Sequence, residues 1–185
     1  FLLLMILSSS LLIFLNLLSF LIASSLLILV IFYPLAKRIM NVPQIILGIV
    51  FSGGILMAFS ASANELPLIA FVLMFANFCW IFSYDTAYAM TDRDDDKFLN
   101  IGNSSNFFKG NEKLVIWLGS LINFFLIFVT GLNENINSYF YIFSFINGFF
   151  LIYSINMIDK NKLITFFNFF KKNNYIGALI FISFF

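Results

Sequence analysis

Five aspartates lie within twelve residues of the chain, in the segment YDTAYAMTDRDDDKF from Tyr84 to Phe98. If the preceding helix continues to the end of this acidic run, a turn of about 100° per residue places Asp85, Asp92 and Asp96 on one face. Asp92 and Asp96 are then an i, i+4 pair of like charges, which weakens a helix unless a cation compensates it. Carboxylates with open geometry suit Mg²⁺, which binds a few of them together with substrate phosphates. The spacing therefore predicts a magnesium site for a phosphate-bearing ligand.

Positive side chains that suit such a ligand occur in a second segment, YPLAKRIMNVPQ. Lys37 and Arg38 lie there, and arginine can hold a diphosphate through forked hydrogen bonds. Asp85 favours a functional interpretation because it lies a turn or two inside the membrane boundary, where an ionisable side chain is costly. Two plainer explanations stay open: a solvated acidic loop, and basic residues that only anchor the topology. Gly102, in the polar segment GNSSN, is predicted to be a turn residue, because the segment lacks the pattern of a phosphate-binding loop.

The elements that carry these side chains are predicted to be membrane helices. Hydrophobic residues make up 62% of the 185 residues and charged residues 10%, and the mean hydropathy is +1.00. This balance lies well outside that of soluble domains. Apolar runs of about 20 residues, each long enough to cross a bilayer, number about seven. Histidine is absent and Cys79 is the single cysteine, which excludes histidine catalysis, a disulfide framework and a cysteine metal site.

Polar clusters divide the chain into these helices. Residues 1–33 are too many for one span and predict two short helices that meet near Asn16. The other predicted helices lie near residues 44–59, 68–90, 114–130, 139–157 and 175–185. All ten lysines and arginines lie in alternate loops, at residues 34–43, 91–113 and 158–174. The opposite loops carry only Glu65 and Glu134. Because basic residues concentrate on the cytoplasmic side, the aspartates are predicted to face the cytoplasm.

The predicted fold class is all-α, a polytopic transmembrane helix bundle. The chain begins with Phe1 in the middle of an apolar segment, without the basic flank or cleavage site of a signal peptide. We therefore expect an N-terminally truncated fragment, whose missing part begins on the same side of the membrane as the aspartates.

Three motifs, YPLAKRIMNVPQIILG, ANFCWIFSYDTAYAMTDRDDD and KKNNYIGALIF, resemble the 4-hydroxybenzoate polyprenyltransferases of the UbiA prenyltransferase superfamily, and the resemblance covers essentially the whole length. It implies a membrane bundle of about nine helices, about seven of them in this sequence, with a central cavity that opens to the cytoplasm. It also implies that residues 1–185 form a single membrane-embedded prenyltransferase domain that lacks its N-terminal helices. Two aspartate-rich motifs would hold Mg²⁺, and the one present here resembles the second.

The resemblance also implies roles for individual residues. Asp92 and Asp96 match metal-binding aspartates, and Asp85 matches the acid of the preceding YDT. The catalytic residues that it implies are Asp92, Arg38 and Asp85. The substrate-binding residues that it implies are Lys37, Arg38, Arg93 and Tyr88. Two departures matter: the first aspartate motif does not occur in this sequence, and Asn103 stands where relatives usually carry a lysine before the serine, which argues against a diphosphate contact there.

The implied reaction transfers a polyprenyl group from polyprenyl diphosphate to the aromatic ring of 4-hydroxybenzoate, in ubiquinone biosynthesis, with Mg²⁺ as the cofactor. The other implied partner is membrane lipid; neither nucleic acid nor a protein partner is implied. The implied location is the bacterial inner membrane, with the active site of a multi-pass protein facing the cytoplasm. Three alternatives stay open: a UbiA-type enzyme with another acceptor, an ion or proton transporter that uses the same charged residues, and an inactive remnant.

Overall fold

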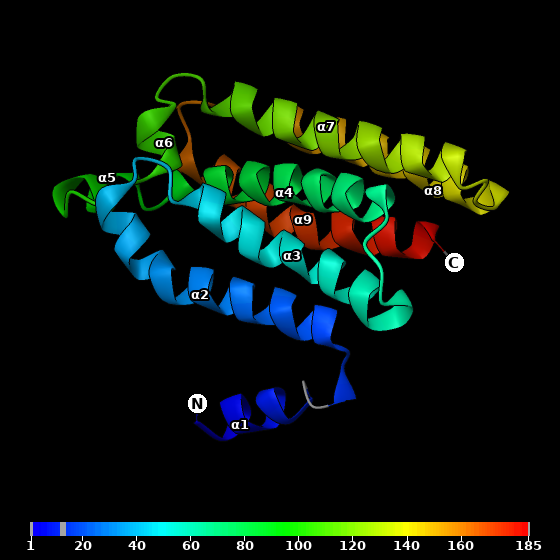
Figure 1. Ribbon diagram of the computed structural model, residues 1–185. Helices are drawn as coiled ribbons and strands as arrows, with labels where there is room; N and C mark the ends of the chain where they lie inside the picture. Colours follow the sequence, from blue (N-terminus) through cyan, green and yellow to red (C-terminus); the bar gives the residue numbers. More distant parts are fainter. Residues whose placement is uncertain (1, 12–13, 185) are drawn as a thin grey trace.

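The computed structural model describes residues 2–11 and 14–184, and all regular elements in these two stretches are helices (Figure 1). The helices are α1 (Leu2–Leu11), α2 (Leu17–Ile39), α3 (Gln44–Ala63), α4 (Leu68–Ala89), α5 (Arg93–Phe98), α6 (Ser104–Phe107), α7 (Glu112–Asn133), α8 (Ser138–Asn156) and α9 (Leu163–Ser183). Helices α5 and α6 are short and lie in the connection between α4 and α7. Helices α2, α3, α4, α7 and α8 are long and apolar enough to cross a membrane. The predicted polytopic all-α bundle is therefore confirmed.

The predicted break near Asn16 is confirmed, and this polar residue separates two helices. The second helix is longer than predicted, because α2 continues past Pro34 to Ile39 and includes Lys37 and Arg38. Asn16 is the N-cap of α2, where its side-chain oxygen accepts a hydrogen bond from the backbone N–H of Ser19 at 2.8 Å. The hydroxyls of Ser19 and Ser60, on α3, lie 2.8 Å apart in the buried contact between these helices. Asn16 therefore begins α2, and Ser19, the residue that it caps, holds α2 against α3.

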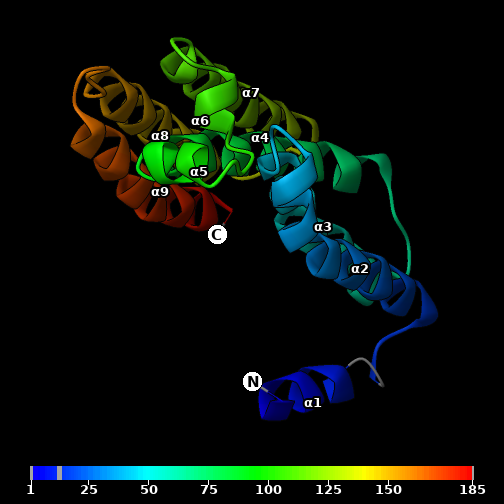
Figure 2. The same cartoon turned by 90° about the vertical axis from the view of Figure 1, so that its left-hand side faces the viewer.

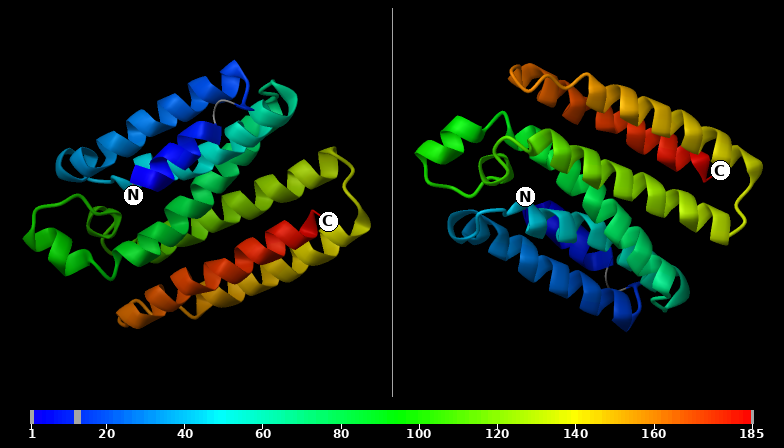
Figure 3. Two further views of the ribbon diagram at one scale, coloured as in Figure 1. Left: turned by 90° about the horizontal axis from the view of Figure 1, so that it is seen from below. Right: turned by 90° about the horizontal axis from the view of Figure 1, so that it is seen from above.

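Helix α4 is the centre of the bundle, because it packs against α3, α7 and α9 (Figure 3). Its contact with α7 uses small and polar residues that let two backbones approach closely. The Ser83 hydroxyl lies 2.7 Å from the Ser120 hydroxyl. Asn123 donates to the Ala76 carbonyl at 3.0 Å, and a Cβ added to Gly119 would lie only 2.7 Å from the Cys79 carbonyl oxygen. These contacts hold α4 rigidly, so its C-terminal end is a firm base for the acidic segment.

The basic parts of the chain gather at one end of the bundle, where Lys37 and Arg38 lie in the last turn of α2 and not in a loop. The connections α2–α3, α4–α7 and α8–α9 all lie at the end where α5 and α6 are found, and the α3–α4 and α7–α8 connections lie at the opposite end (Figure 1). Figure 2 looks onto the first of these ends, with α5 and α6 in front of the bundle. This arrangement agrees with the alternation of charge along the sequence.

The prediction for the last helix is wrong at its start. Helix α9 begins at Leu163, twelve residues before the predicted position, so Lys171 and Lys172 lie within it and not in a loop. Phe166, Phe169, Asn173 and Ile176 are all buried at helical spacing. Phe166 and Phe169 thus extend the buried face of α9 towards its N-terminus. The two lysines lie beside that face, over the rings of Phe167 and Tyr153 at 4.7 Å and 5.0 Å.

Candidate functional site

The acidic segment is not a continuation of α4, and this corrects the sequence prediction. Helix α4 ends at Ala89 and α5 begins at Arg93. The backbone N–H and the hydroxyl of Thr91 both donate to the Tyr88 carbonyl, at 2.8 and 2.7 Å, and so close a turn. The helical angle that related Asp85 to the later aspartates therefore does not apply. The i, i+4 relation within the segment does hold, because the Asp96 N–H donates to the Asp92 carbonyl at 2.9 Å.

The charged residues of α2, α4 and α5 nevertheless come together. The Asp85 carboxylate is close enough to Lys37 and Asp92 to interact electrostatically with both. Tyr33, one turn before Lys37, interacts in the same way with Asp85 and Asp96. The Lys37 ammonium lies 5.5 Å from the centre of the Tyr33 ring. We call these five residues the carboxylate–lysine cluster. It joins three of the predicted acidic residues to one of the two predicted basic ones.

A tight loop connects the two halves of this cluster. Asn100 has a left-handed backbone (φ 52°) and the Ile101 N–H donates to the Asp96 carbonyl at 2.8 Å, which ends α5 in a Schellman turn. The next N–H, of Gly102, donates to the Lys37 carbonyl at 2.7 Å. A Cβ on Gly102 would lie 1.8 Å from the Met40 carbonyl oxygen. Gly102 was predicted as a turn residue; in the structure its Cα instead fits against the end of α2, where a side chain has no room.

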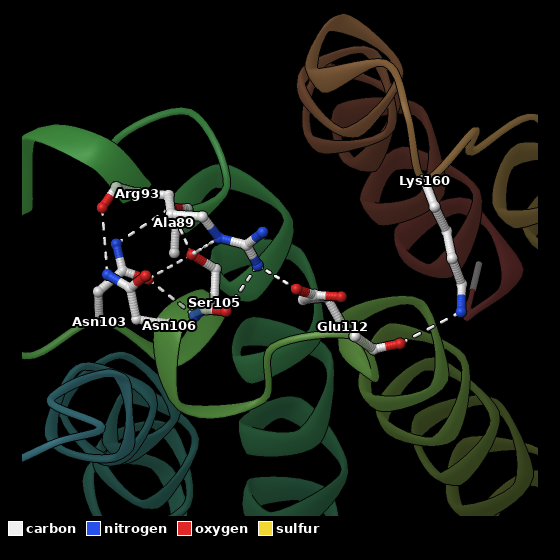
Figure 4. Close-up of polar contacts among 8 residues, drawn as sticks. Ala89, Arg93, Asn103, Ser105, Asn106, Glu112 and Lys160 are labelled. Atoms are coloured by element: carbon white, nitrogen blue, oxygen red, sulfur yellow. Dashed lines mark hydrogen bonds and ion pairs between the residues drawn. The ribbon is translucent and has the colours of Figure 1, made fainter. Parts of the chain in front are cut away.

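Asn103 extends this loop with four hydrogen bonds of its side chain, and Figure 4 includes its partners Ala89 and Ser105. Its amide nitrogen donates to the Asp96 carboxylate at 2.7 Å and to the Ala89 carbonyl at 3.0 Å. Its amide oxygen accepts from the N–H and the hydroxyl of Ser105, at 2.7 and 2.6 Å. The side chain is therefore turned into the protein. This agrees with the expectation that Asn103 makes no diphosphate contact.

Arg93, which the resemblance implied as a substrate-binding residue, lies in a network that fixes the loop (Figure 4). Its guanidinium donates to the carbonyl and hydroxyl oxygens of Ser105, at 2.6 and 3.2 Å, and forms an ion pair with Glu112. The Arg93 side chain is 20% exposed and that of Glu112 is 6% exposed. Arginine geometry favours such paired contacts. The structure therefore gives Arg93 a role in joining α5 to the start of α7.

The two remaining implied substrate-binding residues lie outside the carboxylate–lysine cluster. Arg38 is exposed on α2, and it makes no hydrogen bond or ion pair with the residues that the structure describes. Tyr88 is 38% exposed and packs against Phe170 and Phe167 of α9, with ring centres 5.0 and 6.5 Å apart. The structure thus places Lys37 within electrostatic reach of Asp85, without an ion pair between them among the described residues, and it does not bring Arg38 or Tyr88 into contact with the aspartates.

The carboxylates present suit part of a magnesium shell. Within residues 2–11 and 14–184, no three His, Cys, Asp or Glu side chains are close enough together to hold a metal by themselves. Asp92 and Asp96 are half-buried, whereas Asp94 and Asp95 are exposed. Mg²⁺ commonly takes one or two protein carboxylates and completes its octahedron with water and substrate phosphate oxygens. The donor chemistry of Asp92 and Asp96 fits that partial role.

Two neighbouring cavities lie between α4 and α9, beside the cluster. An open cavity of about 360 Å³ is lined by Tyr84, which precedes Asp85, and by Phe51, Asn77, Trp80, Ile81, Phe170, Asn173 and Asn174. A second cavity of about 190 Å³ shares Asn77 and Trp80, and its lining is otherwise mostly apolar. The Trp80 indole donates to the Asn173 side chain at 2.8 Å where the two cavities meet.

Sequence reasoning missed the polar residues of these cavities. The available signal was the presence of asparagine in or beside apolar segments: Asn77 in FANFCW and the Asn173–Asn174 pair in KKNNY. Amide side chains within membrane helices usually form contacts between helices. The indole contact of Asn173 is of this kind.

Comparisons with known proteins agree with this architecture. The chain matches the UbiA prenyltransferase family over residues 1–175. It is 36% identical over 169 residues to a "4-hydroxybenzoate octaprenyltransferase" of Francisella tularensis subsp. novicida, covering 91% of this chain and 60% of the relative. The same name belongs to a relative from Aeromonas hydrophila, 36% identical over 155 residues, which cover 84% of this chain and 54% of the relative. This chain thus spans less than two thirds of the length of these relatives.

A solved structure shows the same fold. It is the apo structure of a UbiA homologue from Aeropyrum pernix, with a TM-score of 0.74 and 20% identity, covering 93% of this chain and 66% of the other. The sequence match extends over nearly all of the chain, and it includes the acidic segment, the basic end of α2 and most of α9. The chain therefore belongs to the UbiA prenyltransferase family.

Proposed function

We propose that the protein transfers a polyprenyl group from polyprenyl diphosphate to the aromatic ring of 4-hydroxybenzoate, as a Mg²⁺-dependent step of ubiquinone biosynthesis. The names of the two bacterial relatives support the choice of substrates. The observation that carries the proposal is the carboxylate–lysine cluster at the end of a membrane bundle, beside a cavity lined by aromatic and amide side chains. Such a place suits a substrate with a charged head and an apolar tail, because each part meets its preferred surroundings.

In this mechanism Asp92 and Asp96 hold the metal and Lys37 faces the diphosphate. Bound Mg²⁺ supplies the positive charge that stabilises the departing diphosphate. The C1–oxygen bond of the allylic diphosphate breaks, C1 bonds to the ring carbon beside the hydroxyl, and that carbon loses its proton. Lys37 stabilises negative charge that develops on the leaving group. Asp85 is the carboxylate that we assign to accept the ring proton, since it directly follows the cavity residue Tyr84.

We propose further that the site faces the cytoplasm of a bacterium, from its inner membrane. The gathering of basic loops at the α5 end supports this orientation, because such loops remain on the cytoplasmic side. Residues 1–185 would then be one membrane-embedded domain, to which further N-terminal helices with the other aspartate motif belong. Arg38, exposed at the same end of α2, remains in this proposal as a residue that reaches the diphosphate when it binds.

The test compares two pairs of aspartates in the same short segment, Asp92 at the N-cap of α5 and the other three within α5. Asp92→Asn and Asp96→Asn should each lower Mg²⁺-dependent prenylation of 4-hydroxybenzoate by about 100-fold or more, since each removes a charged metal ligand. Asp94→Asn and Asp95→Asn are matched controls, because both side chains are exposed, and they should keep nearly wild-type rates. The protein from the complete gene is assayed in detergent with geranyl diphosphate and ring-labelled 4-hydroxybenzoate.

Several outcomes would reject parts of the proposal. Wild-type rates in both Asp92→Asn and Asp96→Asn would reject the metal assignment. Equal losses in all four variants would mean that only the overall charge of α5 matters. Wild-type protein that prenylates homogentisate but not 4-hydroxybenzoate would support the alternative acceptor. Ion or proton flux in liposomes, without any prenylation and sensitive to Asp85→Asn, would support the transporter alternative.

A further inference from the structure

Asp96 is held at both its backbone and its side chain by the loop that follows α5. Its carbonyl accepts from the Ile101 N–H at 2.8 Å, and one carboxylate oxygen, Oδ2, accepts from the Asn103 amide at 2.7 Å. A helix of only six residues has little stability of its own. The direction of the Asp96 carboxylate therefore depends on the loop and not on α5.

The Asn103 side chain is itself fixed. It is only 2% exposed, and its two N–H groups go to different acceptors, the Asp96 carboxylate and the Ala89 carbonyl. Its oxygen accepts from the N–H of Ser105 at 2.7 Å, which caps α6. The Ala89 carbonyl can only accept and the Ser105 N–H can only donate. The nitrogen and oxygen of the Asn103 amide therefore cannot be exchanged without losing both hydrogen bonds.

The chemistry of this contact suits a carboxylate that has to bind a cation. An amide is a neutral donor, so it orients Asp96 without cancelling its negative charge. A bound lysine would cancel that charge. With Oδ2 occupied by Asn103, Oδ1 is the oxygen left for a metal. The Ala89 carbonyl is at the end of α4, the helix that carries Asp85. Asn103 thus links the helices of two carboxylates in the cluster, by contacts of 2.7 and 3.0 Å.

We propose that Asn103 is a positioning residue that sets the direction of the Asp96 carboxylate and thereby the affinity of the site for its divalent metal. This inference rests on the proposed function, in which Asp92 and Asp96 hold Mg²⁺. Partners that orient a metal ligand typically change metal affinity or activity by about 10- to 100-fold when they are removed. Asn103 does not touch the substrate in this account, so its effect reaches the reaction only through Asp96.

The test separates positioning from loop stability. Asn103→Ser keeps an oxygen that can cap α6, but its side chain is too short to donate to Asp96. Asn106→Ser is the matched control: Asn106 lies three residues further along, in α6, and donates to the Arg93 carbonyl at 3.1 Å, without touching Asp96. Mn²⁺ affinity is measured by electron paramagnetic resonance on the protein from the complete gene, with geranyl thiolodiphosphate present as an inert substrate analogue. Melting temperatures are recorded in parallel without metal.

We expect Asn103→Ser to weaken Mn²⁺ binding by about 10-fold or more, while Asn106→Ser binds Mn²⁺ like the wild type. The Mg²⁺ concentration for half-maximal prenylation should rise by a similar factor. If Asn103→Ser binds Mn²⁺ normally while Asp96→Asn does not, the positioning role is rejected and the proposed function stands. If the wild type binds no Mn²⁺, or Asp96→Asn binds it normally, both are rejected. Equal weakening by both loop variants, with equally lowered melting temperatures, would reduce Asn103 to a structural residue and overturn the inference.

Discussion

Substituting Gly102 by alanine should damage both the stability of the protein and the placement of the acidic segment relative to Lys37. The added Cβ would lie 1.8 Å from the Met40 carbonyl oxygen and 3.1 Å from Cδ of Pro43. Both of these atoms belong to the rigid corner between α2 and α3, which has no flexible side-chain end that could turn away. The loop must therefore move by more than about 1 Å to reach an ordinary van der Waals separation.

The expected cost follows from these contacts. Forcing a methyl group into a packed site costs about 1–3 kcal/mol, and losing the 2.7 Å hydrogen bond from Gly102 to Lys37 adds about 1 kcal/mol. We therefore expect Gly102→Ala to lower the free energy of unfolding by about 2–4 kcal/mol. In a chain of this size that corresponds to a fall in melting temperature of roughly 4–16 °C.

Gly54→Ala is the control, because a Cβ at Gly54 would meet nothing within 4 Å. In the middle of α3, alanine is the better helix former by about 1 kcal/mol, so this variant should melt at or slightly above the wild-type temperature. Melting is followed in detergent micelles by intrinsic tryptophan fluorescence. In kinetics, Gly102→Ala should raise the KM for the prenyl diphosphate, because the loop that holds Asp96 moves away from Lys37. Equal melting temperatures for both variants and the wild type would refute the close approach of the loop to α2.

Two further predictions concern other polar contacts. Glu112→Ala should destabilise the protein by about 2–4 kcal/mol, since it leaves the mostly buried guanidinium of Arg93 unpaired. The Arg93→Ala, Glu112→Ala double variant should lose less than the sum of the single variants in a thermal double-mutant cycle, and additive losses would contradict the ion pair. Trp80→Phe should cost about 1–3 kcal/mol by leaving the Asn173 oxygen unpaired. The control Trp117→Phe, at a site 38% exposed, should not change the melting temperature; equal losses would argue against the indole contact.

Much of the fold could be predicted from the sequence because bilayer thickness fixes the length of an apolar helix. The break at Asn16 could also be predicted, since a lone amide in 33 apolar residues has few places other than a helix end. The start of α9 could not be predicted in this way. A loop was expected where polar residues cluster, yet Phe166 and Phe169 are buried and continue the helical face. These side chains are buried because α8 and α4 pack against α9, and such contacts between helices cannot be read from the local sequence.

The candidate site was predictable only within single elements. The Asp92–Asp96 relation depends on four residues of local backbone, and it holds in the structure. Its relation to Asp85 depended on whether α4 continues, and the side chain of Thr91 helps to close the turn that ends it. The loop after Asp96 lies against the end of α2, which carries Lys37, because Gly102 fits there and donates to the Lys37 carbonyl. Gly102 and the end of α2 are more than sixty residues apart in the chain, so their contact produces no periodic pattern in the sequence.

Arg93 shows how the acidic segment depends on contacts away from its carboxylates. The resemblance implies a substrate-binding role for Arg93, and in the structure its partners are Ser105 and Glu112, the latter nineteen residues further along the chain. Helix α5 has no buried residue of its own, so apolar packing cannot hold it in place. Polar contacts of its first and fourth residues, Arg93 to α7 and Asp96 to Asn103, hold it instead. The carboxylates of Asp92 and Asp96 can therefore stay partly exposed while polar contacts from the protein side fix the helix that carries Asp96.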